Sequence, residues 1–200
     1  MLKNLNKAER AQFAKLSNYK KIQDFLDALP HHDDHKKAEM FSPRRVIREC
    51  RAHCIEGALV AATALWFHGA PPLLMDLRAS KHDDDHVVAL YRRKGLWGAL
   101  SKTQHLVLRF REPVYKTPRE LALSYFNEYY LDDGTKTLRS FSKPFDLRKV
   151  KRNWLTTEDD LGWLAKILDA SPHIQIVPKD LIAQLRKADK VEIEAGKLTI

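Results

Sequence analysis

Cysteine is scarce in this sequence, and long apolar segments are absent. The chain has only two cysteines in 200 residues, whereas a small secreted domain more often carries a dense set of disulfides. No apolar segment is long enough to span a bilayer without interruption by polar groups, and the first residues lack the apolar region of a signal peptide. We therefore expect a cytoplasmic protein that does not enter a membrane.

The sequence also lacks an arginine-rich arm, although its overall charge is positive. It contains 35 lysines and arginines against 26 aspartates and glutamates, a net charge of +9. A polyanion such as nucleic acid is one partner that this balance suggests. The basic residues are spread along the chain, however. A solvated basic surface is therefore the favoured interpretation, and nucleic-acid binding is a weaker alternative.

Internal repeats and long flexible linkers are missing as well, which predicts one domain with helical additions. We place an N-terminal helical extension at residues 1–40 and the main domain at residues 41–200. Apolar residues recur at helical spacing over 7–29, and Pro30 ends that pattern. Residues 31–35 are histidines and aspartates, which could bind a metal ion, but a solvated loop is the favoured interpretation.

The main domain is predicted to be α+β. Ser42 and Pro43 are typical of a helix start. The most apolar run, residues 51–69, predicts a buried helix that carries Cys54 at its head and stops at a C-terminal glycine. Strands are expected at 73–77, 86–91, 96–100 and 106–110. Further along we expect helices over 117–131, from 156 and over 179–187, short strands over 137–141 and 174–177, and a terminal hairpin over 191–200.

Three segments in this order carry a family resemblance. Residues 54–58 begin with the cysteine, residues 86–91 begin with a histidine, and residues 95–101 contain a tryptophan. Over roughly residues 43–110 the chain resembles the transglutaminase-like members of the papain-like cysteine enzyme superfamily. The resemblance implies a central cysteine-bearing helix packed on an antiparallel sheet. It also implies thiol-dependent acyl transfer or amide hydrolysis on a protein or peptide amide.

The resemblance assigns Cys54 as the nucleophile and His86 as the general base. The imidazole would accept the thiol proton and later return it to the leaving group. Where the family usually has an orienting aspartate, this sequence has Ser101. We therefore predict Ser101 as a weak third member, with Gln104 and Asp76 as substitutes. No cofactor and no metal ion are predicted, and the oligomeric state is left open.

Other interpretations stand beside this one. Cys54 is also compatible with plain core packing, and we interpret Cys50 as a core residue. A metal site built from Cys50, His53, Cys54 and His86 is a less favoured hypothesis, because compact Cys-x2-Cys pairs are absent. A catalytically inactive scaffold is the more serious alternative, because of Ser101. The deciding local feature is a helix start at Cys54, since a helix N-terminus stabilises a thiolate.

Overall fold

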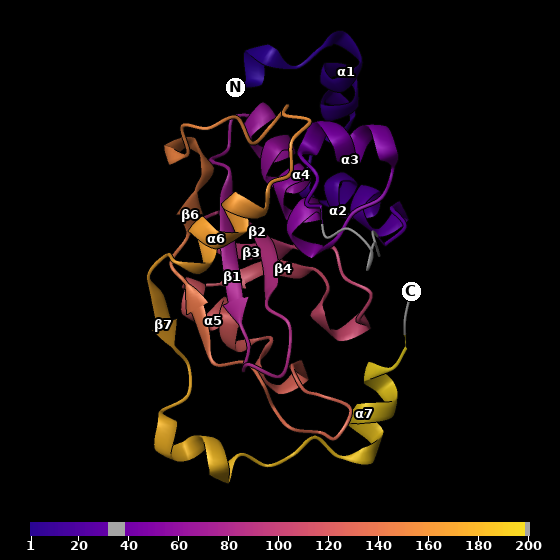
Figure 1. Ribbon diagram of the computed structural model, residues 1–200. Helices are drawn as coiled ribbons and strands as arrows, with labels where there is room; N and C mark the ends of the chain where they lie inside the picture. Colours follow the sequence, from indigo (N-terminus) through magenta and orange to yellow (C-terminus); the bar gives the residue numbers. More distant parts are fainter. Residues whose placement is uncertain (32–38, 199–200) are drawn as a thin grey trace.

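A computed structural model describes residues 1–31 and 39–198 of the chain. Its described part is an α+β fold built on a seven-stranded antiparallel sheet (Figure 1). The strand order is β4-β3-β2-β1-β5-β7, and the short β6 pairs with β1 beside β5. The strands are β1 (Leu73–Arg78), β2 (His86–Arg93), β3 (Leu96–Leu100), β4 (Arg111–Tyr115), β5 (Ser140–Ser142), β6 (Phe145–Asp146) and β7 (His173–Gln175).

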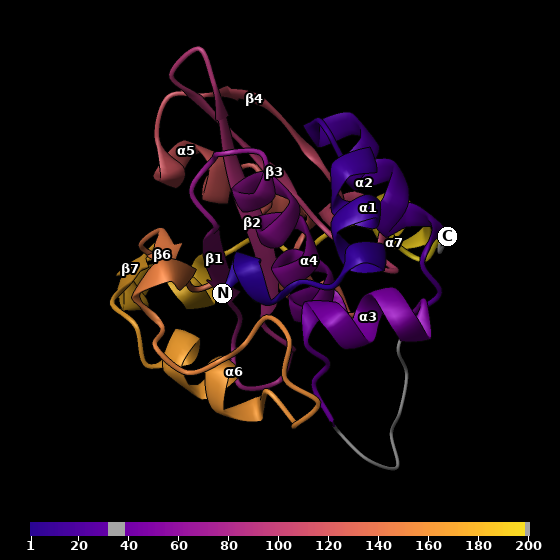
Figure 2. The ribbon, with the colours of Figure 1, turned by 90° about the horizontal axis from the view of Figure 1, so that it is seen from above.

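The helices surround this sheet, and the cysteine-bearing helix α4 packs directly on it. In Figure 2, α1, α2 and α3 gather beside α4, away from β7. No helix of the described residues is long and apolar enough to cross a membrane. The α-helices are α1 (Lys7–Lys15), α2 (Tyr19–Ala28), α3 (Pro43–Glu49), α4 (Cys54–Phe67), α5 (Pro118–Leu123), α6 (Gly162–Asp169) and α7 (Lys190–Gly196). Short 3-10 helices are η1 (Leu2–Asn4), η2 (Leu106–Leu108), η3 (Phe126–Glu128), η4 (Leu147–Lys149) and η5 (Lys179–Gln184).

The central strands of the sheet are buried on both faces, which explains the continuous apolar run of β2. Val87 and Ala89 belong to the core cluster that contains α4, whereas Val88 and Leu90 belong to a second cluster on the other face. This alternation is the ordinary consequence of the period of two along a strand. Helix α4 is apolar all round and almost entirely buried, as expected of a helix covered on every side.

The N-terminal helices complete the cover over α4. Phe13 of α1 and Leu26 of α2 are fully buried in the same core cluster as Leu59 of α4. The predicted α+β class, with a cysteine-bearing helix on an antiparallel sheet, is therefore confirmed, and the region 7–29 forms two helices. The start at Ser42 and Pro43 is also confirmed, because the Ser42 hydroxyl accepts a hydrogen bond from the Arg45 N–H.

One predicted strand and the terminal hairpin are wrong. Residues 106–110 contain the 3-10 turn η2, and the strand begins only at Arg111. This turn brings the Leu108 carbonyl to the Ser101 hydroxyl. Residues 190–196 form helix α7 instead of a hairpin strand, because Asp189 and Glu192 make a capping box at its start. The last two residues of the expected hairpin lie outside the described residues.

Three predicted helices differ from the structure: one is shorter, one starts later in the chain and one is a 3-10 helix. Helix α5 ends at Leu123, and the rest of 117–131 contains only the 3-10 turn η3. Helix α6 starts at Gly162, so the acidic residues before it precede the helix instead of forming its first turn. The helix expected over 179–187 is the 3-10 helix η5. Residues 32–35 of the histidine-rich segment lie outside the described part.

Candidate active site

The chain breaks direction immediately before Cys54, so this cysteine is the first residue of α4. Helix α3 ends at Glu49, and Cys50 adopts a left-handed conformation with φ 54°. The Ala52 N–H then donates to the Pro30 carbonyl at 3.1 Å, and His53 is the extended N-cap of α4. The first N–H groups of a helix have no partner within it and point toward an anion in front of them. The Cys54 side chain therefore stands at the N-terminal end of α4, beside these N–H groups.

A buried glutamate fixes this helix start. Glu56 is 1% exposed, and its two carboxylate oxygens accept hydrogen bonds from two backbone N–H groups. The donors are Phe41, at 2.6 Å, and His53, at 2.7 Å. An acidic side chain in the first turn also interacts favourably with the helix dipole. Glu56 thus ties the incoming chain and the N-cap to the turn that carries the thiol.

Gly57 and Lys102 pack against each other over the same turn. A Cβ on Gly57 would lie 2.4 Å from the Cβ of Lys102, so only glycine allows this close approach. The Lys102 ammonium donates to the Leu29 carbonyl at 2.6 Å, and burial lowers the pKa of Lys102. Sequence reasoning missed both residues, although a glycine in the first turn of a buried helix is a signal of close packing.

The thiol itself is close to a neighbouring imidazole. Cys54 is buried, and its Sγ lies 3.3 Å from Nδ1 of His53. The His53 ring also packs at 5.1 Å, centroid to centroid, from the ring of His31. Cys50, in contrast, is exposed, and its sulfur contacts the Ile47 carbonyl. The prediction that Cys50 is a core residue is wrong, because α3 ends there and turns the side chain outward.

His86 is held by Ser101 in one definite tautomer. The His86 Nε2 lies 2.8 Å from the Ser101 Oγ, which in turn lies 2.9 Å from the Leu108 carbonyl. A carbonyl can only accept, so the single hydroxyl hydrogen of Ser101 goes to Leu108. Ser101 must then accept from the imidazole, and Nε2 carries the hydrogen. The lone pair of neutral His86 is consequently on Nδ1, which makes no hydrogen bond to the rest of the described chain.

Hydrogen bonds from helix α2 hold the backbone of Ser101. Gln23 is buried, and its side-chain amide makes two bonds to the backbone of Ser101. The Ser101 N–H donates to the Gln23 Oε1 at 3.0 Å, and the Gln23 Nε2 donates to the Ser101 carbonyl at 2.8 Å. Sequence reasoning did not single out Gln23. Its polarity on the buried stripe of an amphipathic helix was the available signal, since a buried amide requires partners.

Cys54 and His86 line the same cavity, which measures about 530 Å³. Gln104 also lines it but is exposed, and it makes no hydrogen bond to His86 within the described residues. Ile193 of helix α7 and Lys197, which directly follows this helix, form part of the cavity wall. The described walls carry five carboxylates and two lysines, although the whole chain is basic. The carboxylates come from Asp83, Asp84, Asp85, Glu128 and Asp132.

Tyr129 links the cavity wall to the segment that leads into His86. Its hydroxyl donates to the carbonyl of Asp84, two residues before the histidine. Burial, followed by the nearby charge of Asp83, raises the pKa of Tyr129 well above its ordinary value. The phenol therefore stays neutral and keeps its hydrogen for the Asp84 carbonyl. This contact restrains the start of β2, where His86 stands.

Asp76 is paired with a different histidine. The Asp76 Oδ2 lies 3.1 Å from the Nε2 of His173, and both side chains are buried. Burial, and next the nearby charge of Asp85, raise the pKa of the Asp76 carboxyl to about 6. The Nδ1 of His173 already faces the Ser171 carbonyl at 2.6 Å. Of the three candidate orienting residues, Ser101 is therefore the one that contacts His86.

The four-residue metal hypothesis finds no support in the described part of the chain. Cys50 is exposed, and its sulfur contacts the Ile47 carbonyl. The grouping of His, Cys, Asp and Glu side chains that has ligand spacing there consists of Asp76, Asp85 and Asp169.

Comparison with protein-family models gives no matching family, and comparison with curated proteins gives no similar sequence.

Proposed function

We propose that this chain is a thiol-dependent enzyme of transglutaminase-like type, which transfers or hydrolyses acyl groups of protein or peptide amides. One observation carries the proposal. Cys54, as the first residue of α4, lines one cavity with His86, whose Nε2–H is engaged by Ser101. That hydrogen bond leaves the Nδ1 lone pair available for the thiol proton. A cytoplasmic setting agrees with two thiols that remain unpaired.

The reaction begins with proton transfer from the Cys54 thiol to Nδ1 of His86. The thiolate attacks the amide carbonyl carbon, and the resulting oxyanion accepts hydrogen bonds from N–H groups at the head of α4. The imidazolium then gives its proton to the leaving amine as the carbon–nitrogen bond breaks. Water or a second amine attacks the thioester, which releases the acyl group and regenerates the thiol.

Ser101 acts in this scheme as a positioning residue. Its hydroxyl accepts from Nε2 and holds the ring in the tautomer that the reaction needs. A neutral hydroxyl stabilises the imidazolium less than a carboxylate does, so we expect slower acylation than a Cys-His-Asp triad would give. The five carboxylates of the cavity favour a substrate that carries positive charge near the scissile amide.

Acylation by p-nitrophenyl acetate tests the nucleophile without knowledge of the natural substrate. We expect a burst of nitrophenolate close to one equivalent and an acetyl group on Cys54, located by peptide mass spectrometry. The measurement is made in a Cys50→Ser background, because Cys50 is exposed and would react non-specifically. Cys54→Ala should abolish the burst.

Iodoacetamide labelling across pH supplies a second readout that compares His86→Ala with His53→Ala, which removes the imidazole whose Nδ1 lies 3.3 Å from the thiol. Both histidines line the cavity with the thiol, but only His86 is fixed by Ser101. We therefore expect His86→Ala to remove the enhanced reactivity of Cys54 and His53→Ala to remove less of it. A Cys54 that stays inert to both reagents in the folded protein would overturn the proposal and favour an inactive scaffold.

A further inference from the structure

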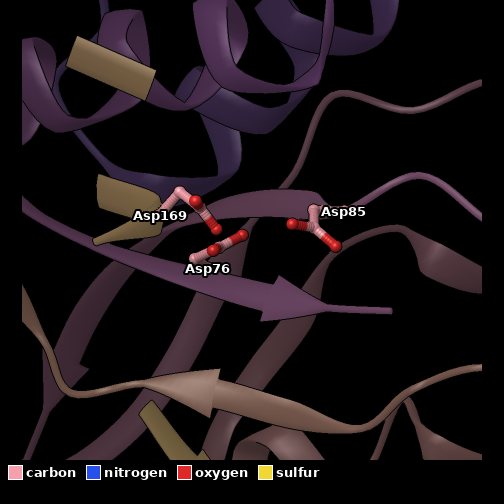
Figure 3. Close-up of side chains that lie close together, drawn as sticks. All are labelled: Asp76, Asp85 and Asp169. Carbon is pink, nitrogen blue, oxygen red and sulfur yellow. The ribbon is translucent and has the colours of Figure 1, made fainter. Parts of the chain in front are cut away.

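Three aspartates from separate segments converge beside β1. Asp76 lies within β1, Asp85 directly precedes β2, and Asp169 is the last residue of α6. One carboxylate oxygen from each lies within 4.8 Å of the corresponding oxygens of the other two. Figure 3 shows the three carboxylates turned toward one another. Mutual repulsion opposes such an arrangement unless a positive charge offsets it.

One oxygen of this cluster has no partner in the protein. Asp76 is 3% exposed, and its Oδ2 is engaged by His173. Its Oδ1 is buried and accepts no hydrogen bond from the described residues. A buried carboxylate oxygen without a donor has lost its hydration and gained no hydrogen bond in return, which is unfavourable. A ligand that accepts an oxygen lone pair would remove this penalty.

Two of the three carboxylates are open to solvent. The Oδ1 of Asp85 accepts from the Ala79 N–H at 2.8 Å, which fixes that carboxylate toward β1. Asp169 pairs through Oδ1 with Arg78 at 2.5 Å, and its side chain is 64% exposed. Asp85 is likewise exposed. An incoming cation could therefore enter from solvent and keep several water ligands.

We propose that Asp76, Asp85 and Asp169 bind an oxygen-preferring divalent cation. Carboxylates and water are the ligands that Mg²⁺, Mn²⁺ and Ca²⁺ select, at about 2.0–2.6 Å. Oxygens within 4.8 Å of one another fit around a single ion of that radius. The guanidinium of Arg78 donates a hydrogen bond to the Asp169 carboxylate. A cation that binds there therefore competes with Arg78 for this carboxylate.

The test uses the full chain after treatment with a chelator, titrated with Mn²⁺ alone. Free Mn²⁺ is measured by electron paramagnetic resonance, and the unfolding temperature is measured in parallel. We expect one saturable site and a higher unfolding temperature with Mn²⁺. Asp76→Asn and Asp169→Asn should each weaken binding about tenfold or more, because affinity follows ligand charge. Competition by Mg²⁺ and Ca²⁺ then ranks the three ions.

Two further variants make the result specific to this cluster. Asp84→Asn removes a charge from the same loop, outside the three-aspartate set, and should leave Mn²⁺ affinity unchanged. Arg78→Gln should tighten binding, since it removes the competitor for Asp169. The absence of a saturable site at millimolar Mn²⁺ would overturn the proposal. An equal loss of affinity in Asp84→Asn and Asp169→Asn would also overturn the proposal. Unfolding would not account for the loss in Asp169→Asn, because Asp169 is exposed and its replacement leaves the core intact.

Discussion

His86 and His173 belong to one sheet, yet their ring nitrogens are used differently. His173 faces the Asp76 carboxylate with Nε2 and the Ser171 carbonyl with Nδ1, so both nitrogens are engaged. His86 uses Nε2 toward Ser101, and its Nδ1 makes no hydrogen bond to the described chain. Asp76, predicted as a substitute for the residue that orients His86, is thus beside the histidine whose nitrogens are both engaged. A ring nitrogen without a partner in the described chain, on a histidine that lines the cavity of the thiol, is the property that a base needs.

The largest expected effect on acylation comes from removing His86. His86→Ala should lower the acylation rate of Cys54 by about 10²–10⁴-fold, the range for loss of a general base. His173→Ala should leave that rate nearly unchanged. It should instead lower the free energy of unfolding by about 1–3 kcal/mol, because Asp76 stays buried without its partner. Ester burst kinetics and urea unfolding separate the two outcomes.

The reverse pattern would break the comparison. If His173→Ala abolished acylation while His86→Ala did not, the base would lie on the Asp76 side of the sheet. Circular dichroism of both variants shows whether a lost rate reflects unfolding.

Substitution of Glu56 tests how far the reactivity of Cys54 depends on the start of α4. Glu56→Ala removes the acceptor of two buried N–H groups, those of Phe41 and His53. We expect a loss of roughly 2–4 kcal/mol in the free energy of unfolding, together with slower alkylation of Cys54. Glu56→Gln keeps one acceptor and should lose less of both.

Glu49→Ala is the control for this prediction. Glu49 is an exposed glutamate that pairs with Arg48, so its removal should change the stability by less than about 0.5 kcal/mol. Urea unfolding of the three variants gives the comparison. Equal losses in Glu49→Ala and Glu56→Ala would contradict the structural role given to Glu56.

Local signals in the sequence were enough for the elements that present this site. Ser42 with Pro43 marked one helix start, and the apolar run after Cys54 marked the buried helix. The pairings between distant segments could not be predicted in the same way. His173 reaches Asp76 across 97 residues, a contact that no periodicity encodes.

Periodicity also failed at the end of α3. The apolar stripe placed Cys50 in the core, but the chain turns left-handed at this residue and exposes it. Sequence order predicted a helix that starts at Cys54 and a strand that starts at His86, and both elements are present. The side chains that surround each residue came from the fold. Gln23 illustrates the same limit, since its partner Ser101 lies 78 residues away.

Substitution of Ser101 should have a smaller effect on the acylation rate of Cys54. Ser101→Ala removes one neutral hydrogen bond to His86, worth about 1–1.5 kcal/mol, or roughly 5–10-fold in rate. Because the hydroxyl orients the imidazole, the pH–rate profile of acylation should change shape as well as height. Ser101→Thr keeps the hydroxyl and should recover much of the rate.

Gln23→Leu tests whether Ser101 positions the His86 ring or serves only in packing. It removes the α2 clamp on the Ser101 backbone and leaves the hydroxyl in place. We expect reduced stability with a pH–rate profile of unchanged shape. If Ser101→Ala behaved in the same way, Ser101 would be a packing residue only.

The smallest expected effect comes from replacing Cys50, which leaves Cys54 as the single thiol in the chain. Cys50 has a positive φ of 54°, a conformation that favours glycine over residues with a Cβ. Cys50→Gly should therefore raise the free energy of unfolding by about 0.5–1 kcal/mol, whereas Cys50→Ser should be neutral. Neither change should alter acylation of Cys54, because the Cys50 sulfur contacts only the Ile47 carbonyl within the described chain. Slower acylation in Cys50→Gly would mean that the turn before α4 must stay rigid to hold the nucleophile, and Glu56 alone would then not fix the helix start.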